Sequence, residues 1–339
     1  MEVNVAGLVT RSFRVDETSQ VGQARREATA LAQTLAFDEA SCGRVALVAT
    51  ELATNMVKHG RGGGLQLSTV AARDGGTGVE LCAIDDGPGF ALADGLRDGY
   101  STAGTPGTGL GAIKRQAQLL DAYCDAKGAI VLARVFAQPR AELDLPYGAL
   151  RVPLHNEVVC GDGWHLAIDA QRVTVSVIDG LGHGPGAADA ADAGTRAAAL
   201  AGGEPGERIA RLHAGMSGTR GGAAAVMQFD ASSGQVRFAG LGNIVASLCD
   251  GDGDGVRGMP SHPGIVGAQF RKAQPFDFPH AAGKLLVMHS DGLQSRWNLR
   301  DHPGLFSRHP RIVAALLLRD YARGRDDCCV FVMRLGGMQ

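Results

Sequence analysis

The sequence has few of the features that mark exported, membrane-spanning or nucleic-acid-binding proteins. Aromatic residues make up 5% of its 339 residues, and a net charge of −2 leaves no basic surface for nucleic acid or acidic membranes. Its longest apolar runs, such as 173–178 and 284–288, fall far short of the ~20 residues of a membrane span. Residues 1–10 lack a basic segment followed by an apolar stretch, so we expect a cytoplasmic protein.

Cysteine is also sparse and forms no framework. The seven cysteines are scattered, no C-x-x-C pair is present, and Cys328 and Cys329 are too close together for a zinc site. We therefore expect reduced, buried thiols. The hydrophobic content of 45% and the charged content of 20% are typical of a soluble globular protein, and the length suits two domains.

Hydrophobic periodicity and proline divide the chain into two parts. In the first part it predicts helices at 24–35 and 41–59 (with Ser41 as N-cap), strands at 65–71, 78–84 and 128–136, and a loop feeding a helix at 107–120. Pro139, Pro146 and Pro153 then interrupt the pattern. We predict a first domain at 1–140, a linker at 141–152 and a second domain at 153–339.

Short strands dominate the second part. They are predicted at 172–178, 223–229, 235–239, 244–248, 284–289 and 329–335, with helices at 186–201 and 310–323. The first part suits a mixed or antiparallel sheet with helices on one face, and the second suits a two-sheet core flanked by helices. The predicted fold class is α+β.

Three segments of the first part contain the residue types of an ATP site. Glu51 and Asn55 lie one helical turn apart, which places a general base beside an oxygen ligand for magnesium, although an ordinary polar helix face shows the same pattern. Asp85 ends a strand in IDDGPGF, where its carboxylate can accept a hydrogen bond from an adenine amine. The glycine-rich segment 107–111 opens a helix, whose exposed amides attract phosphate.

In this order, ELATNMVKHG, IDDGPGF and DGYSTAGTPGTGLGAIKR resemble the GHKL (Bergerat-fold) ATPases, in particular the switch serine kinases of bacterial anti-sigma and stressosome systems. The resemblance covers nearly all of residues 1–140 and implies a two-layer α/β sandwich that binds ATP with Mg²⁺. It implies Glu51 as the general base and Asn55 as the magnesium ligand. The implied nucleotide pocket comprises Asp85, Gly87, Gly89, Thr108, Gly109, Leu110 and Gly111.

Acidic residues stand at several strand ends of the second part. They are Asp162 in CGDG, Asp179 before Gly180 in VIDGLGHG, Asp291 in HSDGL, and the pair Asp326–Asp327. Any one of them is typical of a turn cap. Together they can converge on one edge of a sheet and bind two magnesium or manganese ions, which lower the pKa of a water molecule and stabilise phosphoryl oxygens.

The motifs CGDG, VIDGLGHG, TRGGAAAVM, GLGNI, HSDGL and RDD, spread over 158–331, resemble the SpoIIE-type branch of the metal-dependent serine/threonine phosphatases. The resemblance implies an α-β-β-α four-layer sandwich with no protein nucleophile. Its implied metal ligands are Asp162, Asp179 (bridging), Gly180, Asp291 and Asp326, with Asp327 as the alternative to Asp326. Cys329 stands where the family commonly has threonine, but at a strand position rather than a ligand position. His183 has no second histidine at zinc spacing, so we expect it to shape the loop beside the metals.

The two resemblances predict a bifunctional regulator, with an ATP-dependent serine/threonine kinase-like domain fused to a Mn- or Mg-dependent phosphoserine/phosphothreonine phosphatase. The expected partners are STAS-domain phosphoproteins or anti-sigma antagonists of a partner-switching pathway, and beyond them a sigma factor or stressosome assembly. Kinases of this kind often pair through their N-terminal domain. In the alternative, the N-terminal domain holds a partner with ATP as a structural ligand, and only the phosphatase is catalytic. A phosphatase for other phosphoproteins also fits these residues.

Overall fold

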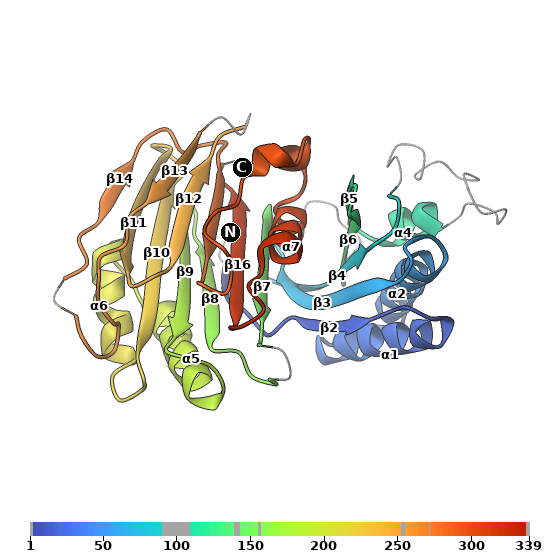
Figure 1. The fold of residues 1–339 in the computed structure, drawn as a ribbon, viewed down its shortest axis with the longest axis horizontal. Helices are drawn as coiled ribbons and strands as arrows, with labels where there is room; N and C mark the ends of the chain where they lie inside the picture. The colour runs from blue at the N-terminus through green and yellow to red at the C-terminus, as the bar shows by residue number, and fades with distance from the viewer. Residues whose placement is uncertain are drawn as a thin grey trace. The chain divides into compact units, whose positions relative to one another are not determined.

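The computed structural model describes residues 3–89, 109–138, 143–154, 157–251, 255–270 and 272–336. The chain folds into two compact units (Figure 1). One consists of Thr10–Leu145, and the other of Met1–Val9 together with Pro146–Gln339. We call the first the inserted unit and the second the host unit, because the chain leaves the host unit after nine residues and returns to it at Pro146.

The inserted unit is the predicted two-layer α/β sandwich. Its sheet is antiparallel in the order β2-β3-β4-β6-β5, and α1 and α2 lie side by side along it (Figure 1). The strands are β2 (Arg11–Arg14), β3 (Gly63–Ala71), β4 (Thr77–Asp85), β5 (Leu119–Asp125) and β6 (Gly128–Phe136). The helices are α1 (Thr18–Thr34), α2 (Glu39–His59) and α4 (Gly109–Gln116).

Helix α2 is held against the sheet by an apolar stripe and begins at a side-chain cap. Val45, Val48 and Leu52 recur on one face and are buried in the core of the inserted unit. The N-cap is Asp38, whose Oδ1 accepts the N–H of Ser41 at 2.8 Å. The prediction of Ser41 as N-cap was therefore wrong, because the aspartate three residues earlier already satisfies that amide.

The host unit contains two antiparallel sheets, ordered β1-β8-β9-β10-β11-β14 and β13-β12-β15-β16-β7. Helices α5 and α6 pack on the first sheet and α7 packs on the second, which gives the predicted four layers. The helices are α5 (Pro185–Leu200), α6 (Pro205–Gly215) and α7 (Pro310–Tyr321). The first sheet comprises β1 (Val3–Ala6), β8 (Asp162–Ile168), β9 (Arg172–Gly180), β10 (Gly222–Asp230), β11 (Gln235–Leu241) and β14 (Phe276–Phe278). The second comprises β7 (Tyr147–Val152), β12 (Val245–Cys249), β13 (Val256–Met259), β15 (Leu285–His289) and β16 (Cys328–Arg334).

An aromatic cluster joins the two sheets of the host unit. Trp164 of β8 lies with its ring centroid 5.5 Å from Phe331 of β16 and 5.9 Å from Tyr147 of β7. Tyr147 and Phe331 stack at 5.8 Å within the second sheet. All three side chains are buried, so they add apolar area and ring contacts at the same place.

Strand β1 precedes the inserted unit in sequence but completes a sheet of the host unit. It pairs with β8 from Val3↔Ile168 to Ala6↔His165, and Gly7 N–H donates to Trp164 O at 2.9 Å. A Cβ on Gly7 would lie 2.0 Å from Trp164 Nε1, so only glycine fits where the chain passes the indole ring. The predicted division placed residues 1–140 in one domain, whereas the structure assigns the first nine to the host unit.

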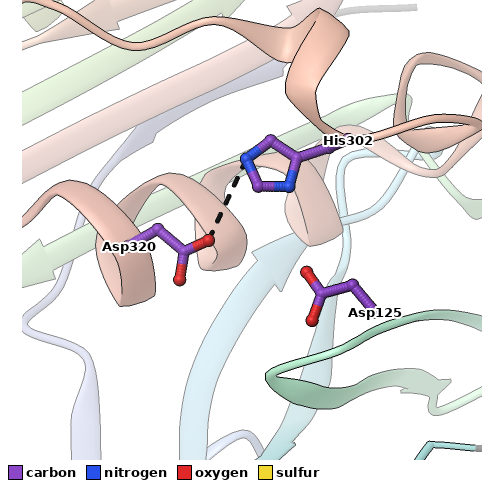
Figure 2. A group of neighbouring side chains, drawn as sticks. All are labelled: Asp125, His302 and Asp320. Atoms are coloured by element: carbon purple, nitrogen blue, oxygen red, sulfur yellow. Dashed lines mark ion pairs between the residues drawn. The ribbon is translucent and has the colours of Figure 1, made fainter.

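The segment between β15 and α7 contains two short 3-10 helices, η2 (Leu299–Asp301) and η3 (Leu305–Ser307). His302 follows η2 and points at Asp320 of α7, with its Nε2 3.9 Å from Oδ2 (Figure 2). Arg319 Nε also donates to Asp320 Oδ1 at 2.9 Å. The contact of His302 with Asp320 therefore links the segment to the end of α7, where Arg319 of the same helix holds the carboxylate.

Among the described residues, no helix is long and apolar enough to cross a membrane. The seven cysteines are free thiols, and most of them are buried.

The contact between β1 and β8 contains a buried histidine that makes the stability of the host unit depend on pH. His165 Nε2 lies 2.6 Å from Asn4 Oδ1, and burial, followed by the charge of Arg208, lowers the pKa of His165 from 6.5 to about 4. Between these values the unfolded chain binds a proton that the native chain does not. The free energy of unfolding is therefore highest above pH 6.5, and it falls by about 3 kcal/mol as the pH drops from 6.5 to 4.

Urea unfolding of wild type and His165→Gln at pH 7.5, 5.5 and 4.5 tests this. We expect the wild type to lose more stability than the variant as the pH falls, because glutamine has no proton to gain. Parallel pH profiles for the two proteins would contradict the assignment.

Candidate functional site

Carboxylates from both sheets of the host unit form one cluster. Antiparallel pairing of β8 and β9 places Asp162 directly opposite Asp179. In the second sheet, Asp291 follows β15 and Asp326 precedes the neighbouring strand β16. The charges of Asp162, Asp179 and Asp326 act on one another, so these strand ends lie together.

Two neutral side chains orient the carboxylates. Ser290 Oγ donates to Asp162 Oδ2 at 2.6 Å and accepts the N–H of Cys329 at 2.9 Å, which ties the two sheets together. Asn243 Nδ2 donates to Asp291 Oδ2 at 2.7 Å. The sequence prediction missed both residues, although HSDGL and GLGNI contain them.

Burial and mutual repulsion raise the pKa values of the cluster. Burial raises the pKa of Asp162 well above its usual range, and the charge of Asp179 raises it further. Burial, followed by the charges of Asp291 and Asp326, raises the pKa of Asp179 to about 7. The pKa of Asp326 is also raised, first by burial. The cluster therefore favours either bound protons or bound cations.

The donor set fits hard divalent cations. Carboxylate and carbonyl oxygens are the ligands that magnesium and manganese prefer. Gly180, which follows Asp179, has no room for a side chain, because a Cβ there would lie 2.3 Å from Ala187 O. Its N–H donates to Gly161 O at 2.8 Å, which holds the turn in place.

A second candidate site lies on α2 of the inserted unit. Glu51 and Asn55 are half-buried, one turn apart, and Gly109 at the start of α4 lies beside both. A Cβ on Gly109 would be 3.1 Å from Glu51 Oε2 and 3.1 Å from Asn55 Oδ1. The structure thus brings together a carboxylate, a carboxamide and a glycine backbone, three of the candidate residues of the ATP site.

Asp85 lies just beyond the C-terminal end of α2. A Cβ on Gly60, the residue after α2, would lie 2.6 Å from Asp85 Cβ. Asp85 Oδ1 accepts the N–H of Gly87 at 2.9 Å and that of Ala129 at 3.1 Å, which fix the carboxylate. A Cβ on Gly87 would lie 2.7 Å from His59 O, so the backbones approach closely only because the residue is glycine.

The remaining predicted pocket residues have different surroundings. Gly89 has φ +71°, and a Cβ there would lie 3.0 Å from Cys124 Cβ. Leu110 packs against the core of the inserted unit, and Gly111 is buried. Thr108 lies outside the described residues.

Comparison with protein families assigns both units. The model of the histidine kinase-like ATPase domain matches residues 14–135, and the model of stage II sporulation protein E (SpoIIE) matches residues 169–336. The first match lies within the inserted unit and the second within the host unit. The inserted unit is a histidine kinase-like ATPase domain, of a kind that binds ATP, and the host unit is a SpoIIE-type phosphatase domain, of a metal-dependent kind.

Individual proteins and solved structures are similar to parts of the chain. The chain is 33% identical over 93 residues to the serine/threonine-protein kinase RsbT of Bacillus subtilis, a match of 27% of this chain and 69% of RsbT. A solved structure concerning the bacterial stressosome is 26% identical with a TM-score of 0.52, and covers 56% of this chain and 98% of that one. The solved structure of the SpoIIE phosphatase domain from Bacillus subtilis, with a fragment of its regulatory domain, is 17% identical with a TM-score of 0.49. The match covers 76% of this chain and 79% of that one.

The SpoIIE match leaves out part of the phosphatase site. It begins at residue 169, after β8, so Asp162 lies outside the matched range. The β8–β9 register and the hydrogen bond from Ser290 place Asp162 in the cluster independently of the family match.

The structure distinguishes the two adjacent aspartates of the SpoIIE domain. Asp327 is buried, and its two oxygens accept the N–H groups of Leu154 and Gly161, each at 2.7 Å. Its carboxylate is therefore occupied in holding the chain before β8. Asp326 is less buried, its Oδ1 accepts the N–H of Asp327 at 2.9 Å, and the charge of Asp291 acts on its carboxylate, so it is the candidate metal ligand of the two.

Two further residues of the SpoIIE domain stood out in the sequence, Cys329 and His183. Cys329 is a fully buried residue of β16 whose backbone N–H, rather than its thiol, contacts Ser290. His183 is exposed in the loop after Gly180, with Nδ1 3.3 Å from Glu157 Oε1. Its charge acts on Asp326, so it lies beside the cluster.

Neutralising each aspartate separately tests these roles. Asp327→Asn should lower the free energy of unfolding by about 2–4 kcal/mol in EDTA, because two buried amides lose a charged acceptor. Asp326→Asn should leave it unchanged or raise it, because a repelling charge is removed, but should weaken manganese binding. Urea unfolding in EDTA and manganese titration measure both. Greater destabilisation by Asp326→Asn would reverse the roles.

Proposed function

We propose that the chain is a bifunctional regulator that adds phosphate to and removes phosphate from serine or threonine residues of partner proteins. The ATPase domain acts as the kinase, and the SpoIIE domain acts as the Mn- or Mg-dependent phosphatase. The observation that carries the proposal is the cluster of buried carboxylates from the strand ends of two sheets, whose raised pKa values favour bound cations or protons and whose oxygen donors suit hard divalent cations. The intact set of Glu51, Asn55 and Gly109 supports the kinase part.

In the SpoIIE domain, Asp162, Asp179, Asp291, Asp326 and the Gly180 carbonyl would hold two divalent cations, which supply a nucleophilic water and neutralise phosphoryl oxygens. Asp179 lies between the acids of both sheets, so it suits a shared ligand. Ser290 and Asn243 keep Asp162 and Asp291 oriented. Because the acids come from strand ends of two packed sheets, the donors are pre-positioned and little reorganisation is needed.

In the ATPase domain, Glu51 would accept the proton of the attacking serine or threonine hydroxyl, and Asn55 Oδ1 would bind the magnesium of ATP. Asp85, held by Gly87 and Ala129, would accept the adenine amine. Glu51 lies within α2, and Asp85, the last residue of β4, lies beside Gly60 just beyond the C-terminal end of α2, so the two acids would face the phosphate end of ATP and its base, respectively.

Partners are proposed from the relatives. Similarity to the RsbT kinase and to a stressosome structure supports a partner-switching pathway, in which the substrate is a STAS-domain phosphoprotein or an anti-sigma antagonist. A sigma factor or a stressosome assembly would then lie downstream, and two copies would pair through the ATPase domain. Fusion raises the effective concentration of each activity at a shared partner. A signal must bias one activity, because otherwise the two would form a futile cycle.

Hydrolysis of p-nitrophenyl phosphate by the full chain tests the phosphatase. We expect activity with manganese, none with EDTA, and a loss of at least about 100-fold in Asp179→Asn, since a shared ligand is removed. Asp277→Asn, an exposed acid on β14, serves as the matched control and should keep wild-type activity. Equal activity of Asp179→Asn and wild type would refute the assignment.

Glu51→Gln separates the kinase from a scaffold that uses ATP only as a structural ligand. We expect the variant to bind a fluorescent ATP analogue as wild type does but to lose phosphate transfer to a STAS-domain protein, because only the base is missing. Asn55→Ala should lose transfer as well, and Glu39→Gln, at the start of α2, should behave as wild type. If Glu51→Gln and Asn55→Ala both lose phosphate transfer but still regulate the partner as wild type does, the result would favour the scaffold.

A further inference from the structure

The segment Thr219–Gly222 runs beside the turn Asp179–Gly180, which carries two of the proposed metal ligands of the SpoIIE domain. Gly222 pairs with Gly180, and a Cβ on Gly222 would lie 2.1 Å from Asp179 O. On the other side of the turn, Leu181 N–H donates to Gly221 O at 3.0 Å. Arg220 therefore emerges from backbone that is fixed against the Asp179–Gly180 turn.

The side chain of Arg220 crosses the loop that follows this turn. A Cβ on Gly186 would lie 2.6 Å from Arg220 Nε and 2.8 Å from its Cζ, and a Cβ on Gly182 would lie 3.6 Å from Nη1. The guanidinium thus lies against the first turn of α5 and close to Gly182 in the loop before it, in space left free because residue 186 is glycine. Arg220 is nevertheless exposed.

The charge of Arg220 is not neutralised within the part of the chain that the structure describes. No described carboxylate forms an ion pair with it, although several lie at the adjoining strand ends. The neighbouring His183, in contrast, is paired with Glu157 at 3.3 Å. An exposed guanidinium at the edge of a carboxylate cluster is available for an anion bound there.

We propose that Arg220 binds the phosphoryl group of the substrate at the SpoIIE site and so determines its affinity for phosphate monoesters. The inference rests on the proposed phosphatase function. A guanidinium can donate two parallel N–H bonds to phosphoryl oxygens, a geometry that lysine cannot reproduce. The contact needs no bond to form or break, and it acts on binding more than on the chemical step.

The test is calorimetric binding of inorganic phosphate to the full chain with magnesium present, together with the KM and kcat for p-nitrophenyl phosphate. In Arg220→Ala we expect phosphate affinity to fall and KM to rise by about tenfold or more, the loss of one charge-assisted contact. The change in kcat should be smaller, and the magnesium dependence should be unchanged. Arg220→Lys should recover only part of the loss.

Two matched variants distinguish a specific contact of Arg220 with phosphate from the general electrostatic attraction of exposed arginines. Arg172→Ala removes an exposed arginine at the far end of β9 and should behave as wild type. Arg325→Ala removes the exposed charge next to Asp326 and should have a smaller effect than Arg220→Ala. Wild-type phosphate affinity in Arg220→Ala, an equal loss in Arg325→Ala, or no phosphate binding by the wild type would overturn the proposal. Phosphate binding that depends on Arg220 without any hydrolysis would uphold the contact but refute the proposed phosphatase.

Discussion

The register between β8 and β9 is the constraint on which the phosphatase site depends, because it places Asp162 opposite Asp179 in buried surroundings. Two buried carboxylates at such a position repel each other and lose hydration, which is unfavourable for folding unless cations or protons compensate. The surrounding hydrogen bonds from Ser290 and Asn243, and the anchoring of the nearby chain by Asp327, hold the acids where repulsion would separate them. The carboxylate cluster therefore lowers the stability of the host unit and at the same time provides its binding site.

Strand β1 links the order of the chain to the assembly of the host unit. Asn4 bonds to His165 across 161 positions of sequence, and the whole inserted unit lies between them. Long-range pairing of this kind is slow to form. Strand β1 forms one edge of the first host sheet by pairing with β8, and β8 begins with Asp162. The first strand of the chain therefore lies beside the strand that carries one acid of the phosphatase site.

Elements with long, regular apolar spacing could be predicted from the sequence, and short elements without such spacing could not. Helix α2 and strand β6 were located because their apolar spacing is long and regular. Strands β1 and β2 are four residues each, too short to show a period, and the burial of β7 and β8 depends on neighbours distant in sequence. The cap of α2 was misplaced because Asp38 and Ser41 are both good caps, and only the backbone geometry distinguishes them.

For the sites, the primary structure alone established which residue types are available and in which order: Glu51 one turn before Asn55, glycines around Asp85, and aspartates at strand ends. It did so because these patterns depend on local spacing, which a single chain displays. The contacts of Gly109 with Glu51 and Asn55, the bond from Ser290 to Asp162, and the different hydrogen bonds of Asp326 and Asp327 became visible only in the folded structure. These depend on contacts between segments distant in sequence, and such contacts arise only when the strands pair and the sheets pack.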